Sequence, residues 1–393
     1  MKSRRLLDKV LKIGLNGNCC GCTTCRELCP KNAIEILPNN KGFLYPTVNQ
    51  DCVNCGICEK FCPLMTEKVN DYDQHYYAAK RKNDELRKLS QSGGAFSVFA
   101  EDVLKQSGVV YGVSLNKDLM AVYSRVDNIS QLQKLRGSKY VQASVGNIFS
   151  SVKQDLINEK LVLFSGSPCH VHGLILFLRA GKVDTKNLIT VDIICHGVVS
   201  PLVFRDYKEN TEKRYKKRVR DFNFRDKQFG WHGCHTNAKI GMFNYISDDY
   251  VNIFYSDLAL RDCCFECRYT NLQRVGDITV GDCWGIENNK KEFDDNKGVS
   301  LIIINSKKGE DLFLTNKSEF ISFSVDIKDY LQPNLAAPTP KPKDLSDFWE
   351  DYSTFGFEYA AFKYCSFSPQ KDYVLLKRND YIKRVIRKIN KVI

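Results

Sequence analysis

Cysteine carries the clearest chemical signal in this sequence, because nine of its 17 cysteines lie in fewer than fifty residues near the N-terminus. One spacing, C-x2-C-x2-C-x3-C-P, occurs at residues 19–30 and again at residues 52–63. Three thiolates on a tight loop can bind three corners of a cubane, while the fourth, before proline, reaches the other cluster. The sequence therefore predicts two 4Fe-4S clusters with crossed ligands, one on Cys19, Cys22, Cys25 and Cys62 and the other on Cys52, Cys55, Cys58 and Cys29.

The alternative for these motifs is a pair of zinc sites, but zinc knots usually combine two C-x2-C pairs and have no need of a C-x3-C-P ending. Cys20 falls outside the repeated spacing and is not expected to be a ligand. The segment resembles the bacterial two-cluster ferredoxin fold over residues 14–66. In that fold residues 33–53 form short strands, with Asn39–Gly42 as their turn.

A third group of cysteines is spread over the rest of the chain. Cys264 and Cys267 form a C-x2-C pair that needs two more thiolates. We expect Cys169 and Cys195 to supply them, because a βαβ unit starts at Leu161 with strand LVLFSG, turn SPCHVHG, helix LILFLRAG and strand LITVDIIC. Both cysteines then lie at the carboxyl edge of the sheet. A third 4Fe-4S cluster is predicted; the alternatives are free buried cysteines or a structural zinc.

The remaining cysteines, Cys20, Cys234, Cys263, Cys283 and Cys365, are expected to be small apolar core residues, although Cys263 could replace Cys264 as a ligand.

Strand and helix signals alternate over residues 76–330, which predicts an α/β domain with a parallel or mixed sheet. The fold class is therefore α+β: a ferredoxin-type domain (1–68), an α/β domain (75–335), and a proline-rich connector with a helical basic tail (336–393).

Glycine-rich and basic segments mark candidate binding loops. Ser92-Gly93-Gly94 precedes an amphipathic helix, so it either offers backbone N–H groups to an anion such as a pyrophosphate or only caps the helix. Arg136 and Lys139 in LRGSKYVQ, and Arg225–Lys227 in NFRDKQFGWHG, either contact a ligand or are solvated charges.

Taken in order, SGG, GSKYVQ, SGSPCHVHGL, VDIICHGVVSP, NFRDKQFGW, CCFEC and GDITVGDCWG resemble the coenzyme F420 hydrogenase/dehydrogenase beta-subunit family, in the form with an N-terminal two-cluster ferredoxin domain. The resemblance runs from about residue 14 to about residue 330. It implies a domain that binds FAD or FMN beside a 4Fe-4S cluster. Carried over by position, the flavin-binding candidates are Ser92, Gly93, Gly94, Ser138, Lys139 and Tyr140, with Asp282 and Trp284 near the active face. His170 replaces a glutamine of the family pattern, and Cys283 replaces an aromatic residue.

The resemblance implies an iron-sulfur flavoprotein oxidoreductase whose clusters carry single electrons and whose flavin exchanges two with an organic substrate. The substrate would be coenzyme F420 or a sugar-polymer biosynthesis intermediate. The alternative function is a non-catalytic electron-transfer subunit of a larger redox complex. Either function needs a redox partner protein or coenzyme, whereas nucleic acid is not expected, since the basic run at residues 213–220 lacks a nucleic-acid-binding motif.

Four of the six histidines lie in the suspected site loops, so one of them is a candidate general acid beside the flavin. We predict His196 or His232 for this role.

The chain lacks a signal-peptide pattern and a long apolar run, which predicts a cytoplasmic protein. Residues 371–393 hold eight Lys or Arg and two Asp, so their net charge of +6 is half of the chain's +12. Residues 381–393 have the pattern of a basic amphipathic helix. Such a helix could dock on the protein itself or a dimer mate, lie at the inner membrane surface, or bind a partner.

Overall fold

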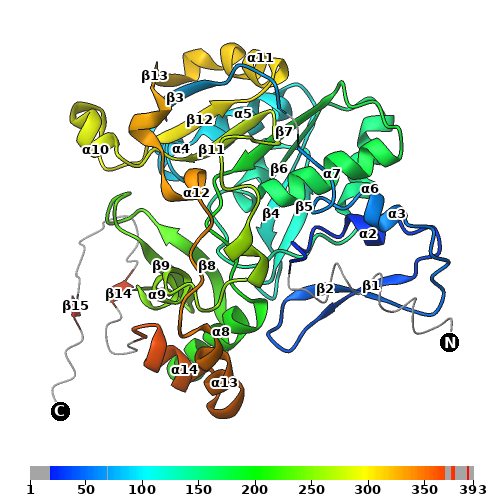
Figure 1. The fold of residues 1–393 in the computed structure, drawn as a ribbon. Coiled ribbons are helices and arrows are strands. Elements are labelled where there is room, and N and C mark those ends of the chain that lie inside the picture. The colour runs from blue at the N-terminus through cyan, green and yellow to red at the C-terminus, as the bar shows by residue number, and fades with distance from the viewer. Residues whose placement is uncertain (1–17, 69, 368–372, 377–386, 389–393) are drawn as a thin grey trace, which may run out of the picture.

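The computed structural model describes residues 18–68, 70–367, 373–376 and 387–388. Its elements form an N-terminal module, a central sheet covered on both faces by helices, and a second sheet beside it (Figure 1).

The N-terminal module contains α2 (Thr24–Glu27), β1 (Ile34–Pro38), β2 (Leu44–Val48) and α3 (Ile57–Lys60). The two strands pair antiparallel. In their turn, the Asn39 side-chain oxygen accepts hydrogen bonds from the backbone N–H groups of Lys41 and Phe43, and Gly42 has φ +78°. The strands and turn predicted for this segment are confirmed.

The central sheet has the order β13-β3-β12-β11-β7-β6-β4-β5. Its strands are β3 (His75–Arg81), β4 (Val109–Leu115), β5 (Ala121–Val126), β6 (Val162–Gly166), β7 (Leu188–Ile193), β11 (Ile278–Asp282), β12 (Ser300–Ile304) and β13 (Phe320–Ser324). Strands β4, β6, β7 and β11 are parallel, and the outer strands pair antiparallel. The predicted mixed sheet is confirmed.

Helices cover both faces because the central strands are apolar on both sides. On one face, α5 (Ala95–Lys105) and α11 (Lys307–Thr315) bury Phe99 and Phe313 against Leu163 and Ile302. On the other face, α6 (Ile148–Ile157) and α7 (Pro168–Ala180) pack on the opposite side chains of the same strands.

The start of α7 corrects the sequence prediction. SPCHVHG was expected to be a turn, yet the helix begins at Pro168, so Cys169, His170 and His172 lie in its first two turns. The reason is local: proline at the first helical position has a suitable φ and lacks only an N–H that the helix would leave unpaired.

The second sheet has the order β15-β14-β10-β9-β8 and is antiparallel. It comprises β8 (Val219–Asp226), β9 (His235–Ile240), β10 (Phe243–Ser247), β14 (Tyr373–Leu376) and β15 (Arg387–Lys388). The helices in this part of the chain are α8 (Pro201–Tyr215), α9 (Asp249–Tyr255), α13 (Leu345–Phe355) and α14 (Phe357–Tyr364). Three further short helices are α4 (Asp84–Lys88), α10 (Ile286–Asn289) and α12 (Pro333–Ala336).

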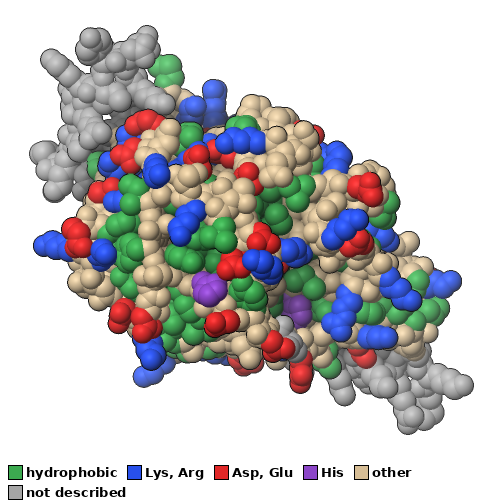
Figure 2. Space-filling view, turned by 90° about the horizontal axis from the view of Figure 1, so that it is seen from above, with side chains coloured by type: hydrophobic (Ala, Val, Ile, Leu, Met, Phe, Trp, Pro, Cys, Tyr) green, Lys and Arg blue, Asp and Glu red, His purple; other side chains and the backbone are tan. Residues whose placement is uncertain are grey.

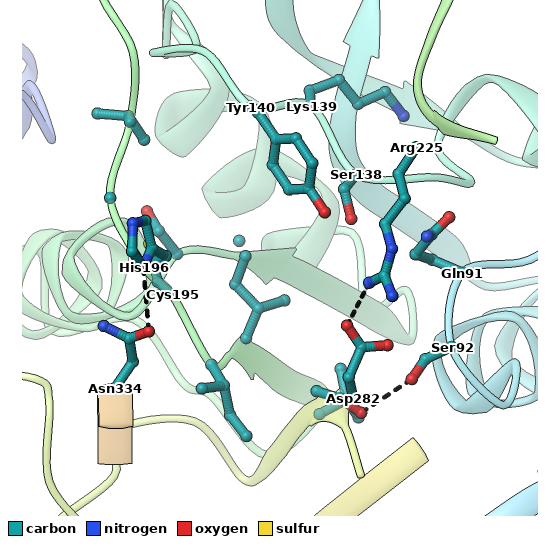
Figure 3. Close-up of a pocket in the computed structure, with 18 of the residues that line it drawn as sticks. Gln91, Ser92, Ser138, Lys139, Tyr140, Cys195, His196, Arg225, Asp282 and Asn334 are labelled. Atoms are coloured by element: carbon teal, nitrogen blue, oxygen red, sulfur yellow. Dashed lines mark hydrogen bonds and ion pairs between the residues drawn. The ribbon is translucent and has the colours of Figure 1, made fainter. Parts of the chain in front are cut away.

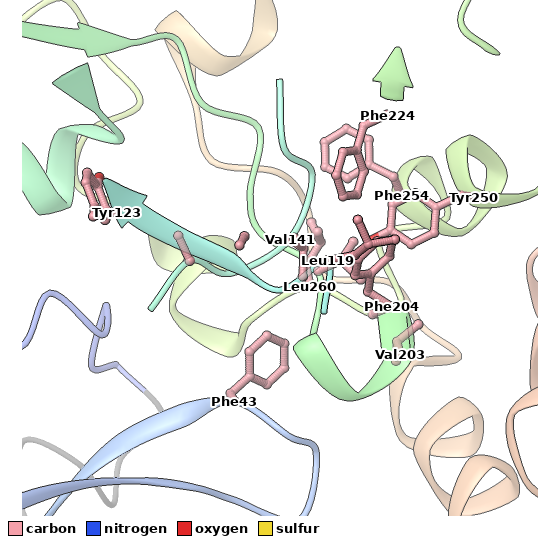
Figure 4. Packing of buried hydrophobic residues seen from close by; sticks show 14 of the residues in the cluster. Phe43, Leu119, Tyr123, Val141, Val203, Phe204, Phe224, Tyr250, Phe254 and Leu260 are labelled. Carbon is pink, nitrogen blue, oxygen red and sulfur yellow. The ribbon is translucent and has the colours of Figure 1, made fainter. Parts of the chain in front are cut away.

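The N-terminal module shares a hydrophobic core with the rest of the molecule. Phe43 is fully buried and extends from the β1–β2 hairpin toward Val203 and Leu260, as Figure 4 shows. Its ring also meets Trp349 of α13 edge to face, with 6.5 Å between centroids. This packing fixes the cysteine loops of the module against the large domain.

The predicted tail helix over residues 381–393 lies outside the described residues except for Arg387–Lys388, which are extended in β15 rather than helical. Within the described chain, no helix is both long and apolar enough to span a bilayer. On the face seen from above in Figure 2, acidic and basic side chains are interspersed.

Candidate functional site

A cavity of about 790 Å³ lies at the carboxyl ends of β6, β7 and β11. Its other walls are the start of α5, the loop at residues 135–141, and residues 332–340. This volume suits a cofactor-sized ligand. Most of the residues predicted for flavin or catalysis line it: Ser92, Gly94, Ser138, Lys139, Tyr140, His196, Asp282 and Trp284.

The Ser92-Gly93-Gly94 segment brings the N-terminus of α5 to the cavity. Ser92, with φ +52°, donates through Oγ to the carbonyl oxygens of Gly281 and Val299 at 3.1 and 2.9 Å. Gly93 does not line the cavity but packs behind it, where a Cβ atom would lie 2.3 Å from the Ala79 oxygen and 2.5 Å from the Ser300 nitrogen. Gly94 caps α5 without a side chain, and residues 94–97, at the positive dipole end of the helix where the first N–H groups have no partner within the helix, line the cavity.

The loop that carries Ser138, Lys139 and Tyr140 forms a second wall. Lys139 directs Nζ to the carbonyl oxygens of Arg136 and Gly137 at 2.7 and 3.1 Å, and burial lowers its pKa to about 7. Tyr140 stacks on Phe254 at a centroid distance of 4.2 Å, and burial raises the pKa of its phenol to about 12. The tyrosine is therefore a neutral hydrogen-bonding group at neutral pH.

A buried ion pair closes the third side of the cavity. Arg225, 2% exposed, binds the Asp282 carboxylate and donates to the Trp231 carbonyl oxygen at 2.9 Å. The same carboxylate accepts from Trp231 Nε1 at 2.8 Å, and the Trp231 ring stacks on Trp284 at 4.7 Å. Asp282 thus holds the cationic side chain in place.

His196 lies across the cavity from this pair. Its Nε2 is 2.6 Å from Asp257 Oδ1, and its Nδ1 is 3.3 Å from Asn334 Oδ1. In Figure 3, His196, Cys195 and Asn334 lie on one side of the cavity, Arg225, Gln91, Asp282 and Ser92 on the other, and Ser138 and Tyr140 above and between them.

His232, the other candidate, does not line the cavity. Its side chain is 35% exposed and its Nε2 is 2.6 Å from Asp294 Oδ2, beyond the Trp231–Trp284 stack. The structure thus brings only one of the two predicted histidines to the cavity.

The inner thiol group is Cys19, Cys22, Cys25 and Cys62. These residues line a small hollow beneath the β1–β2 hairpin, which Cys20 and Cys58 also line. The outer thiol group, Cys29, Cys52, Cys55 and Cys58, includes the exposed Cys55. The two groups are named after the ligand sets predicted from the spacing, which remain predictions.

The third thiol group is Cys169, Cys195, Cys264 and Cys267. Cys169 interacts electrostatically with Cys195 and Cys267, and Cys263 lies beside Cys264. The Cys20 thiol interacts with the thiols of both Cys22 and Cys169, so it connects the inner and third groups.

Among the described residues, no three His, Cys, Asp or Glu side chains are spaced to hold one metal ion. In a cubane each thiolate binds a different iron, so its ligands need a wider spacing than those of a single ion. Burial raises the pKa of Cys19 to about 11 and that of Cys62 to about 12. Thiols in such surroundings are deprotonated by a bound metal, whose charge offsets the cost of burial. The donor set fits iron-sulfur clusters.

The cavity also has the polar groups that a flavin would need. Two buried donors that line it, Gln91 Nε2 and Arg225 Nε, have no hydrogen-bond partner within the described part of the chain. Buried donors are almost always paired in native proteins, so these two indicate a polar ligand. They lie on the same side as the positive end of α5, which suits an anionic or carbonyl-rich ligand.

Residues 159–324 match the family model that describes the C-terminal region of the coenzyme F420 hydrogenase/dehydrogenase beta subunit. Over these residues the chain is similar to this family. The matched segment contains the third thiol group, His196, Arg225 and Asp282, whereas the Ser92 loop and both N-terminal thiol groups lie outside it.

No curated protein matches the chain. A solved structure titled as the F420-reducing [NiFe] hydrogenase complex from Methanosarcina barkeri, derivatised with xenon, is similar over 81% of this chain and 99% of that chain, with a TM-score of 0.46 and 14% identity. A likeness of this size carries no functional argument.

Several residues of the cavity could not be anticipated from the sequence. Gln91, Asp257 and Asn334 were not candidates, and residues 336–340 were expected to be only a connector, yet they line the cavity. For Gln91, its position directly before the Ser-Gly-Gly motif was a weak sign that it belongs to the site. No such signal pointed to Asn334, because it lines the cavity only when its segment folds beside His196.

Proposed function

We propose that this protein is an iron-sulfur flavoprotein oxidoreductase that passes electrons between ferredoxin-type clusters and a flavin, FAD or FMN, in the 790 Å³ cavity. The observation that carries the proposal is the position of Cys195. Cys195 lines the cavity, and its thiol interacts with Cys169 and Cys267 of the third thiol group. A cluster on this group would lie directly beside a ligand in the cavity.

The order of the thiol groups supports a path for electrons. The outer thiol group includes an exposed cysteine, where a redox partner protein can approach. The inner group lies against α7, where a Cβ on Gly173 would be 3.2 Å from Cys22 Sγ. Cys20 connects it to the third group, which borders the cavity. Clusters in this order would link the molecular surface to the flavin.

A bound flavin would supply the exchange between single electrons and a two-electron transfer to an organic substrate. The chain's own residues then have distinct tasks. The first N–H groups of α5 would bind phosphate, and Gln91 and Arg225 would donate to polar atoms of the ring or chain. Tyr140, fixed by Phe254, would hold one side of the ligand.

His196 is proposed as the proton donor or acceptor for the substrate. Its ring lines the cavity next to Cys195, and the contact of its Nε2 with Asp257 at 2.6 Å orients the ring. The substrate is proposed to be coenzyme F420 or a sugar-polymer biosynthesis intermediate.

The test is flavin binding by anaerobically prepared protein, with Gln91→Leu as the variant and Gln106→Leu as its control. Gln106 is exposed at the opposite end of α5. One lost hydrogen bond corresponds to roughly a tenfold weaker Kd for Gln91→Leu. The control should bind flavin as the wild type does. Wild-type protein that binds neither FAD nor FMN would refute the proposal.

A further inference from the structure

Arg261 is buried beside the cysteine loops without a carboxylate partner. Its side chain is 0% exposed, and Nε donates to the backbone oxygen of Cys19 at 2.7 Å. Both terminal nitrogens, NH1 and NH2, lack a hydrogen-bond partner among the residues that the structure describes. An unpaired guanidinium inside a protein is costly, so this arrangement needs a counter-charge.

The neighbours of Arg261 identify where that counter-charge belongs. Its guanidinium interacts electrostatically with Cys19 of the inner thiol group and with Cys20 and Cys263, and it also acts on Cys169 of the third group. The nearest acidic side chain along the chain, Asp262, pairs with Lys41 at 3.4 Å instead. The cation therefore interacts with at least one thiol of each of these two groups.

The fold holds Arg261 rigidly in this position. Its guanidinium lies 3.9 Å from the centre of the Tyr45 ring. Its backbone N–H donates to the Val198 oxygen, and its own carbonyl oxygen accepts from the Cys264 N–H. Gly21, with φ +75°, allows the close approach, since a Cβ there would meet the Gln142 side chain at 2.6 Å and the Arg261 guanidinium at 3.4 Å.

We propose that Arg261 is the shared counter-charge of the clusters on the inner and third thiol groups and raises the reduction potentials of both. The inference rests on the cluster part of the proposed function. Cluster potentials depend on local charge, hydrogen bonds to sulfur and solvent exposure. Reduction adds a negative charge to a cluster, and a fixed cation beside it stabilises that reduced form. We expect the outer thiol group to lie outside this effect, because none of its cysteines is among the strongest electrostatic partners of Arg261.

The experiment is an anaerobic redox titration, followed by electron paramagnetic resonance, of wild type, Arg261→Gln and Arg261→Lys, with iron content measured in each. The control is Arg125→Gln, which removes the same charge from an arginine paired with Asp155 and Asp127. The signal lost in Cys55→Ser identifies the outer cluster and gives an internal reference.

We expect Arg261→Gln to shift two of the three midpoint potentials to more negative values, with the outer cluster unchanged. The midpoint potentials of Arg261→Lys should stay closer to those of the wild type. Those of the control, Arg125→Gln, should equal the wild-type values. If Arg261→Gln loses iron, retention of iron by Arg261→Lys supports the inference. Equal iron loss in both variants, or unchanged potentials in iron-loaded Arg261→Gln, would overturn this inference alone. Wild-type protein without cluster iron would overturn the proposed function as well.

Discussion

His196 and His232 provide a matched pair for testing the proton-transfer role, because each ring lies 2.6 Å from an aspartate but only His196 lines the cavity. His196→Gln should lower kcat by about 10²- to 10⁴-fold, the usual contribution of a general acid. Flavin and iron content should stay at wild-type levels. Steady-state turnover with reduced viologen as donor measures the effect. A larger loss in His232→Gln than in His196→Gln would contradict the assignment.

Asp282 is predicted to matter for stability as well as for the site. Asp282→Asn keeps the shape of the side chain but leaves the Arg225 guanidinium, 2% exposed, without its carboxylate. Breaking a buried pair in this way costs about 3 to 5 kcal/mol. Denaturant unfolding of the protein measures the change in free energy of unfolding.

The comparison for this variant is Asp127→Asn. The Asp127 side chain forms an ion pair with Arg125 and is 51% exposed. Loss of its charge should therefore lower the free energy of unfolding by no more than about 1 kcal/mol. Equal effects of the two substitutions would show that Asp282 does not hold Arg225 in place.

At the scale of secondary-structure elements, Gly93, which lies just before α5, should not tolerate a side chain. A Cβ on Gly93 would meet backbone atoms of β3 and β12 at 2.3 and 2.5 Å, and backbone cannot move aside as a side chain can. Gly93→Ala should therefore reduce both Tm and flavin binding. Gly146→Ala is the control, since its Cβ would contact nothing within 4 Å and bears only the roughly 1 kcal/mol cost of a positive φ. If both variants bind flavin like the wild type, the Ser-Gly-Gly segment does not shape the site.

The elements were partly predictable from the sequence. The β6–α7–β7 unit, the mixed sheet and the β1–β2 hairpin follow from apolar runs and turn residues, which act locally. The start of α7 was missed because Ser167-Pro168 was interpreted as a turn rather than as a helix start. Residues 336–340 were interpreted as a connector because proline content alone does not reveal a cavity behind the segment.

Across the molecule as a whole, the sequence supports a specific proposal for the cysteines but not for the cavity around the flavin candidates. A cluster ligand is restricted in residue type and spacing, so the inner and outer thiol groups could be proposed from the chain. Gln91, Asp257 and Arg261 are ordinary residues whose roles arise only when distant segments meet. The shared core around Phe43 makes that meeting possible, since it fixes the cysteine loops beside Arg261.

A flavin in the cavity that exchanges electrons with clusters on the thiol groups is the core of the proposed function. An anaerobic reductive titration of flavin-reconstituted protein, followed by its visible absorption spectrum, tests this exchange in one experiment. We expect about one flavin and about twelve irons per chain, with flavin and cluster absorbance both bleached by one reductant added in steps. A protein that binds iron but no flavin, or a flavin that stays oxidised while the clusters are fully reduced, would refute the proposed exchange.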